Sequence, residues 1–260
     1  MTERGVTITE DARDPFGGRG KEQYVRDVFD AIARPYDRMN LIITAGIFRR
    51  WERYFVEHLG VRPGMRVLDV ACGTGELSLA VARLMGDSGE VVGLDLSPGM
   101  LAVAREKART RPESRRVEFI EGNALHMPFP DDYFDLVLSG FALRNFADLP
   151  AALAEMVRVT RPGGRVTSLE LSQPVNPLLA APYKFYFFHI VPRLGRLVER
   201  TWGKPGGVTP YAWLAISLKG FPGAPALAAM IREQGLVQVG FRYLTGGIVA
   251  VHWGDKPGAA

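Results

Sequence analysis

A glycine-rich loop after an apolar run is the part of the sequence best suited to bind a small molecule. The run Val67–Ala71 is followed by Cys72-Gly73-Thr74-Gly75, and a second apolar run ends at Asp95, about 20 residues further on. Paired glycines let the backbone approach a ligand, and an acid ending the second strand of a βαβ unit accepts hydrogen bonds from ribose hydroxyls. The spacing predicts a site for a nucleoside-containing cofactor.

The loop differs from that of dinucleotide-binding proteins. Their Gly-x-Gly-x-x-Gly fingerprint needs a third glycine, whereas here the loop continues Gly75-Glu76-Leu77-Ser78. Glu76 would repel a pyrophosphate, and Asp69 and Glu76 together favour a cationic ligand without phosphate. S-adenosylmethionine (SAM), a sulfonium with an amino-acid tail, is such a ligand. For the glycine pair alone, a simple strand-to-helix turn is the alternative.

Later signals occur in the order found in class I methyltransferases, which share such a loop. Asn123-Ala124 follow the third predicted strand, Asp135 opens the fourth, and Arg161-Pro162-Gly163-Gly164 precede the fifth. The carboxyl ends of parallel strands form the edge where open α/β proteins bind ligands. This order favours SAM over a nicotinamide cofactor.

Composition limits the protein to one α/β domain of ordinary size, since 260 residues are 47% hydrophobic. The 32 Lys and Arg against 28 Asp and Glu form no dense cluster, which argues against nucleic acid but permits contact with an anionic membrane surface. One cysteine and four scattered histidines predict neither a disulfide nor a metal site. No run of about 18 apolar residues occurs, so we expect a cytoplasmic protein, peripheral at most to the inner face of the membrane.

Hydrophobic periodicity and turn residues divide the chain. We expect a disordered leader over 1–20, two helices within 21–60 separated at Pro35, a core over 61–174, an aromatic-rich lid over 175–221, and a helix with two strands over 222–255. Predicted strands cover 66–71, 91–94, 116–121, 134–139, 166–171, 237–244 and 247–253, and predicted helices cover 77–84, 98–110, 151–159 and 224–234. Alternating strands and helices predict a parallel, doubly wound α/β sheet.

Several longer segments resemble the ubiquinone/menaquinone biosynthesis C-methyltransferases from about residue 24 to 255. They are residues 28–40, 72–75, 127–131, 143–145 and 188–195. The resemblance implies a class I, Rossmann-like fold with a seven-stranded, mostly parallel sheet, helices on both faces, N-terminal helices and a lid after the fifth strand. It also implies SAM as methyl donor and a prenylated quinol as acceptor, with demethylmenaquinol converted to menaquinol.

The predicted cofactor-binding residues lie in the N-terminal helices and at strand ends: Tyr36, Asn40, Asp69, Ala71, Gly73, Thr74, Gly75, Asp95, Leu96, Met100, Asn123, Ala124 and Ser139. Asn123 alone could also be a turn former. Methylation of a ring carbon requires a quinol hydroxyl to lose its proton. Arg144 could stabilise the phenolate, with Asn145 aiding orientation, and His189 and Tyr211 are further catalytic candidates. A solvated surface cation is the alternative for Arg144.

The lid departs from the family pattern in two places. Ile216 stands where related enzymes have an acid, and residues 201–207 form an enlarged Gly/Pro-rich loop. Because both differences lie in the lid, they leave the identity of the methyl acceptor undetermined, and a methyltransferase for another aromatic or lipid-like molecule is an alternative. A SAM-binding subunit without activity is a second alternative, and a homodimer is also left open.

Overall fold

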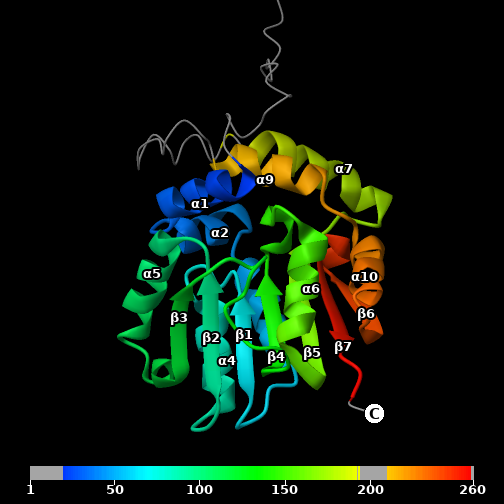
Figure 1. Ribbon diagram of the computed structural model, residues 1–260. Coiled ribbons are helices and arrows are strands. Elements are labelled where there is room, and N and C mark those ends of the chain that lie inside the picture. The colour runs from blue at the N-terminus through cyan, green and yellow to red at the C-terminus, as the bar shows by residue number, and fades with distance from the viewer. Residues whose placement is uncertain (1–19, 192, 194–209, 259–260) are drawn as a thin grey trace, which may run out of the picture.

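The computed structural model describes residues 20–191, 193 and 210–258 (Figure 1). Residues 1–19 of the predicted leader, residues 201–207 and part of the segment 188–195 therefore lie outside the described residues. A seven-stranded sheet runs in the order β3-β2-β1-β4-β5-β7-β6. Its strands are β1 (Arg66–Val70), β2 (Glu90–Asp95), β3 (Val117–Glu121), β4 (Phe134–Gly140), β5 (Thr160–Leu171), β6 (Val237–Leu244) and β7 (Val249–Asp255). β1 to β5 are parallel and β7 is antiparallel to both its neighbours, so the predicted mostly parallel sheet is confirmed.

Helices cover both faces of the sheet because successive strand residues point to opposite sides. Val67 packs with Phe55 and Val81 on one face, whereas its neighbour Leu68 packs with Leu153 on the other. The first face carries α3 (Phe48–Glu57) and α4 (Glu76–Met85), and the second carries α6 (Leu149–Val159) and α10 (Ala224–Glu233). α5 (Pro98–Ala108) packs beside β3, where Phe119 contacts Leu101.

The N-terminal segment forms three helices, so the prediction of two was wrong. Between α1 (Lys21–Ile32) and α3 lies α2 (Tyr36–Ile43), and Pro35 is the residue that precedes it. Proline is tolerated at the start of a helix because the N–H it lacks would be unpaired there. Pro35 therefore begins a helix where the sequence reading treated it only as an interruption.

Strand β5 also begins earlier than predicted. Thr160 pairs with Phe134, and the register then shifts, so that Arg165 pairs with Leu136. Gly163 has a φ of +74° within this irregular stretch, a conformation that glycine adopts without a Cβ penalty. The Arg161–Gly164 segment is thus an irregular part of the strand and not a loop before it.

Helices from the N-terminal segment and from the lid after β5 lie across the carboxyl ends of the parallel strands (Figure 1). They are α1 and α2 together with the lid helices α7 (Pro177–Phe185) and α9 (Pro210–Lys219). α7 runs into a short π-helical turn, Tyr186–Ile190. Among the helices of the described chain, none is long and apolar enough to cross a membrane.

Candidate functional site

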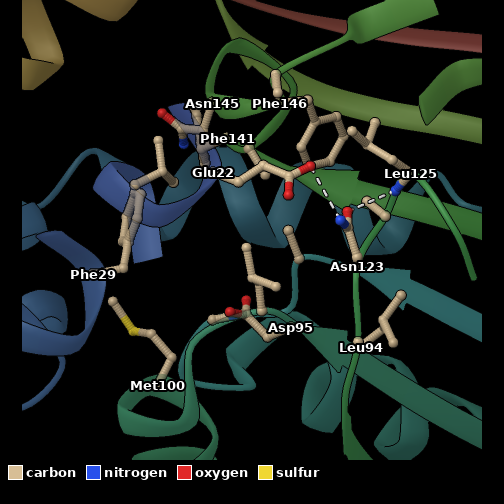
Figure 2. A pocket seen from close by; sticks show the side chains of 18 of the residues that line it. Glu22, Phe29, Leu94, Asp95, Met100, Asn123, Leu125, Phe141, Asn145 and Phe146 are labelled. Carbon is tan, nitrogen blue, oxygen red and sulfur yellow. Dashed lines mark hydrogen bonds between the residues drawn. The ribbon is translucent and has the colours of Figure 1, made fainter. Parts of the chain in front are cut away.

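A pocket of about 750 Å³ opens at the carboxyl ends of β1, β2 and β4 (Figure 2). α1 contributes Glu22, Val25 and Phe29, and the strand ends contribute both small residues and the larger side chains of Leu94 and Phe141. Of the residues predicted to bind the cofactor, it is lined by Tyr36, Ala71, Gly73, Asp95, Leu96, Met100, Asn123 and Ala124.

Asp95 is the acid of this pocket. Its Oδ2 accepts a hydrogen bond from the Gly73 N–H at 2.7 Å and its Oδ1 accepts one from the Ser97 N–H at 2.8 Å. Burial raises the pKa of Asp95 to about 6, although both N–H groups oppose that shift. The carboxylate is therefore charged at neutral pH, and it lies where the ribose of a nucleoside would find an acceptor.

A second pocket of about 770 Å³ adjoins the first. Phe29, Tyr36 and Phe141 line both pockets, and Phe141 adopts a φ of +58° while its ring stacks on Phe48 with centroids 4.9 Å apart. The remaining wall is largely apolar: Val28, Ile32, Met39, Ile43, Trp51, Leu171, Phe187, Trp213 and Leu214, with Asn40, Thr44 and Arg144 as polar members. These three shared aromatic residues show that the two pockets have a common boundary.

Arg144 and Asn145 lie on one short turn, η2 (Leu143–Asn145), and are 9% and 7% exposed. Arg144 lines the second pocket, and its Nη1 donates to the Phe141 carbonyl oxygen. Asn145 lines the first pocket, and its Oδ1 accepts from the Trp213 indole N–H at 3.0 Å. The alternative of a solvated surface cation for Arg144 is therefore wrong.

Comparison with known proteins decides the family. A model of the ubiE/COQ5 methyltransferase family matches residues 18–256. The chain belongs to the ubiE/COQ5 methyltransferase family. It is 40% identical to the ubiquinone/menaquinone biosynthesis C-methyltransferase UbiE of Proteus mirabilis, over 98% of this chain and 100% of that protein. It is 41% identical to the demethylmenaquinone methyltransferase of Symbiobacterium thermophilum, over 91% of this chain and 94% of that protein.

Solved structures agree on the fold. A SAM-dependent methyltransferase from Thermotoga maritima gives a TM-score of 0.61 at 18% identity, covering 89% of this chain and 99% of that one. One from Aquifex aeolicus gives 0.56 at 17% identity, covering 78% and 88%. The class I fold and the resemblance predicted from sequence are confirmed. The protein is a SAM-dependent C-methyltransferase.

Two residues of the glycine loop lie near the first pocket without lining it. The Thr74 hydroxyl donates to Asp37 Oδ1 at 2.6 Å, which ties the loop to α2. Gly75 has a φ of +79°, and a Cβ there would lie 2.7 Å from the Phe119 ring. This close approach explains the second glycine as a packing requirement.

Asp69 and Ser139 are buried at the ends of β1 and β4 and also do not line the pocket wall. Asp69 Oδ2 accepts from the Ser78 hydroxyl at 2.6 Å, while Asp69 Oδ1 and Ser139 Oγ have no hydrogen-bond partner among the described residues. Burial raises the pKa of Asp69 to about 7. The Ser78 hydroxyl thus joins Asp69 to α4, and neither Asp69 nor Ser139 lines the pocket.

Asn123 serves in part as the turn former named as its alternative. Its Oδ1 accepts from the Leu125 N–H at 2.9 Å, and its Nδ2 donates to Glu22 Oε1 at 3.1 Å (Figure 2). Glu22 of α1 thus reaches a loop on the sheet side of the pocket. Sequence reasoning did not single out Glu22, because an acid in the first turn of an amphipathic helix is ordinary.

The remaining predicted residues are placed elsewhere. Asn40 lines the second pocket and not the first. His189 is exposed, stacks on Phe185 with centroids 5.1 Å apart and lines neither pocket, so its position gives no support for a catalytic role. Tyr211 belongs to α9, but its side chain lies outside the described part of the chain.

Glu76 does not line the first pocket, so the argument that it would repel a pyrophosphate bound there was wrong. Its carboxylate pairs with Lys107 Nζ at 2.7 Å and with Arg111 Nη2 at 3.2 Å, on the outer side of α4. These cations offset burial and lower the pKa of Glu76. The acid therefore stabilises the α4–α5 packing, and the cofactor assignment depends on Asp95, the missing third glycine and the family.

Proposed function

We propose that this protein transfers the methyl group of SAM to a ring carbon of a prenylated hydroquinone, with demethylmenaquinol as acceptor and menaquinol as product. The observation that carries this proposal is the pair of adjoining pockets. One contains Asp95 and the glycine loop, and the other is apolar with Arg144 in its wall. The names of relatives that are about 40% identical over nearly their full length support the same acceptor class.

The reaction is a displacement in which the S–CH₃ bond breaks as the new ring C–CH₃ bond forms. SAM, when bound, supplies the methyl group and the positively charged leaving sulfur. The ring carbon becomes nucleophilic as the hydroxyl proton leaves, and the ring hydrogen is later released as a proton. The chain contributes mainly position and the exclusion of water.

Arg144 is suited to stabilise the phenolate that develops in the apolar pocket. A guanidinium remains charged at all working pH values, and preorganised donors in a site that excludes water are worth more than in solution. Tyr36 lines both pockets. Burial raises its pKa, whereas the charge of Arg144 and a hydrogen bond with Asn40 lower it. Tyr36 therefore serves as a neutral hydrogen-bonding group beside the acceptor.

The test supplies SAM with a labelled methyl group and a reduced demethylmenaquinone analogue to the purified protein. We expect label on the quinol ring. The oxidised quinone is the matched control substrate and should accept no methyl group, because it has no hydroxyl to ionise. Absence of transfer to any prenylated quinol, with SAM binding intact, would leave the silent SAM-binding subunit as the better account.

Another aromatic or lipid-like acceptor is the second candidate. The departure at Ile216 motivates it, but Ile216 is 47% exposed on α9 and lines neither pocket. Replacing the family's acid there leaves the apolar wall unchanged, which favours the quinol. A panel of quinols, phenols and hydroxylated lipids separates the two, since a preference for a phenol without a prenyl tail would favour this second candidate.

Peripheral membrane contact through the lid would give the enzyme access to an acceptor dissolved in lipid. Large apolar side chains on and before α7 are exposed, with Leu178 at 84%, Val175 at 61% and Phe185 at 59%. We expect the protein to sediment with vesicles of anionic phospholipid, and the double variant L178D/F185D to do so less. The matched control is L84D, because Leu84 is 50% exposed on α4. A homodimer stays a prediction, to be measured by light scattering.

A further inference from the structure

Glu170 is a buried acid to which the proposed methyl transfer assigns no role. It lies in β5 between Leu169 and Leu171 and is 0% exposed. A carboxylate removed from water is costly unless hydrogen bonds and an opposite charge compensate it. Its partners should therefore show why an acid is placed in an otherwise apolar strand.

One carboxylate oxygen holds the turn that separates the two pockets. Glu170 Oε1 accepts hydrogen bonds from the N–H groups of Ala142 and Leu143, each at 2.7 Å. These N–H groups directly follow Phe141, whose φ of +58° is unfavourable for a residue with a side chain. The two bonds stabilise the chain reversal that places Phe141 between the pockets.

The other oxygen lies beside Arg144. Glu170 Oε2 is 3.7 Å from Arg144 Nη1, and the side chains are 0% and 7% exposed. Neither Glu170 Oε2 nor Arg144 Nε has a hydrogen-bond partner among the described residues. The pair is thus close enough to balance charge, yet the guanidinium keeps a donor for another acceptor.

We propose that Glu170 is a positioning residue, which holds the Phe141–Asn145 turn and acts as counterion to Arg144 so that the guanidinium faces the acceptor pocket. This inference rests on the proposed function. Without a counterion, the buried charge of Arg144 would carry a large uncompensated desolvation cost. Glu170 thereby acts on the reaction through Arg144 and does not touch the acceptor itself.

Several charged and titratable groups surround the pair. Lys21 Nζ of α1 lies 3.4 Å from the Arg144 carbonyl oxygen, and the charge of Arg144 acts on Tyr36 of α2 and Tyr183 of α7. Burial raises the pKa of Glu170 to about 7, against the opposing effects of Arg144 and the two N–H groups. The counterion is therefore charged above neutral pH and lost as the pH falls below about 7.

The decisive variant is E170Q, because glutamine keeps an oxygen for the two N–H groups but removes the charge. We expect SAM affinity and thermal stability close to those of the wild type. We expect kcat on reduced demethylmenaquinone analogue to fall by roughly 10- to 100-fold, as for loss of a partner that orients a functional side chain. We expect wild-type kcat to fall as the pH drops below 7. E170D should show the same fall, and E170Q should not.

The matched control is S168A. Ser168 is buried on the same strand, lines neither pocket, and its hydroxyl has no partner within the described chain. We expect its kcat and KM to equal those of the wild type. The proposal would be overturned if E170Q had the kcat and the pH profile of the wild type. If E170Q does not fold, it would be overturned by an E170D enzyme whose kcat does not fall below pH 7.

A readout without turnover separates this inference from the proposed function. In protein labelled with ¹⁵N-arginine, the Arg144 Nε–H signal is assigned by its loss in R144K. We expect that signal to shift through about pH 7 in the wild type and to stay constant in E170Q. If the signal titrates in a protein that methylates no quinol, the proposed function is wrong but the Glu170–Arg144 interaction is supported. A signal that stays constant in the wild type would contradict that interaction.

Discussion

The indole N–H of Trp213 donates to Asn145 Oδ1 at 3.0 Å and so joins the lid helix α9 to the turn bordering both pockets. The Trp213 ring also meets Tyr24 of α1 edge to face, with centroids 5.2 Å apart. Trp213 and Tyr24 are buried. The lid helix α9, the first helix and the turn after β4 therefore pack together at Trp213. We expect a change at this lid residue to alter the acceptor pocket.

Replacing Trp213 by Phe keeps an aromatic ring but removes the donor. A neutral hydrogen bond is worth about 0.5–1.5 kcal/mol, so we expect KM for the quinol to rise about 2- to 10-fold, with a smaller change in kcat. The control is W253F, because Trp253 of β7 lines neither of the two pockets. Unchanged KM in W213F would show that the bond does not couple the lid to the acceptor.

Arg144 lines only the acceptor pocket of the two, so R144A should separate turnover from SAM binding. We expect kcat to fall on the order of 100- to 1,000-fold, as for loss of an oxyanion-stabilising group, with SAM affinity by calorimetry within about 2-fold. R144K should recover part of kcat because it restores the charge but not the planar fork. R232A, at an exposed arginine of α10, is the control. Turnover unaltered in R144A would remove Arg144 from the mechanism.

The parallel core could be predicted because its elements are local. Short apolar runs such as 134–139 end at glycine, proline or acidic residues, and the observed strand is Phe134–Gly140. Ser97 accepts from the Met100 N–H at the start of α5, as the Ser97-Pro98 pair predicted. Helix α2 was missed because the same proline that ends one helix begins the next.

The site was predictable only where its residues follow one another in the sequence. Asp95 ends a strand and Gly73 and Asn123 each follow one closely, so their meeting follows from the topology. Glu170 and Trp213 reach the turn after β4 through pairings that no local pattern encodes. One signal was present for Glu170: an acid inside the apolar run Val166–Leu171 indicates a buried carboxylate with a partner.

Asp95 should dominate SAM affinity. D95N keeps one acceptor oxygen but loses the charge, and hydrogen bonds to a charged group are worth about 1.5–3 kcal/mol. We expect SAM binding to weaken roughly 10- to 100-fold by calorimetry. The control is D87N, because Asp87 is exposed and lines neither pocket. Equal SAM affinity in D95N and the wild type would contradict the ribose assignment.

His252 should make the folded protein sensitive to acid. It is 1% exposed in β7, its Nε2 lies 3.2 Å from the Ala224 carbonyl oxygen, and its Nδ1 has no partner among the described residues. Because a carbonyl only accepts, Nε2 carries the proton of a neutral ring. Burial lowers the pKa of His252 from 6.5 to about 4.

The sign of the pH effect follows from which state binds the proton. Between pH 6.5 and about 4 the unfolded chain protonates His252 while the folded chain does not, so this stability is complete above pH 6.5 and is lost on acidification. Asp69, Asp95 and Glu170 have raised pKa values and act in the opposite direction. The total change of unfolding free energy with pH therefore does not report on His252 alone.

The measurement is a difference between wild type and H252Q in the free energy of unfolding by urea. At about 1.4 kcal/mol per pH unit, the wild-type advantage should shrink by about 3 kcal/mol from pH 7 to pH 4. S168A changes the residue opposite His252 without removing a titrating group, and its difference from wild type should not vary with pH. A constant difference for H252Q would mean that folding does not change the pKa of His252.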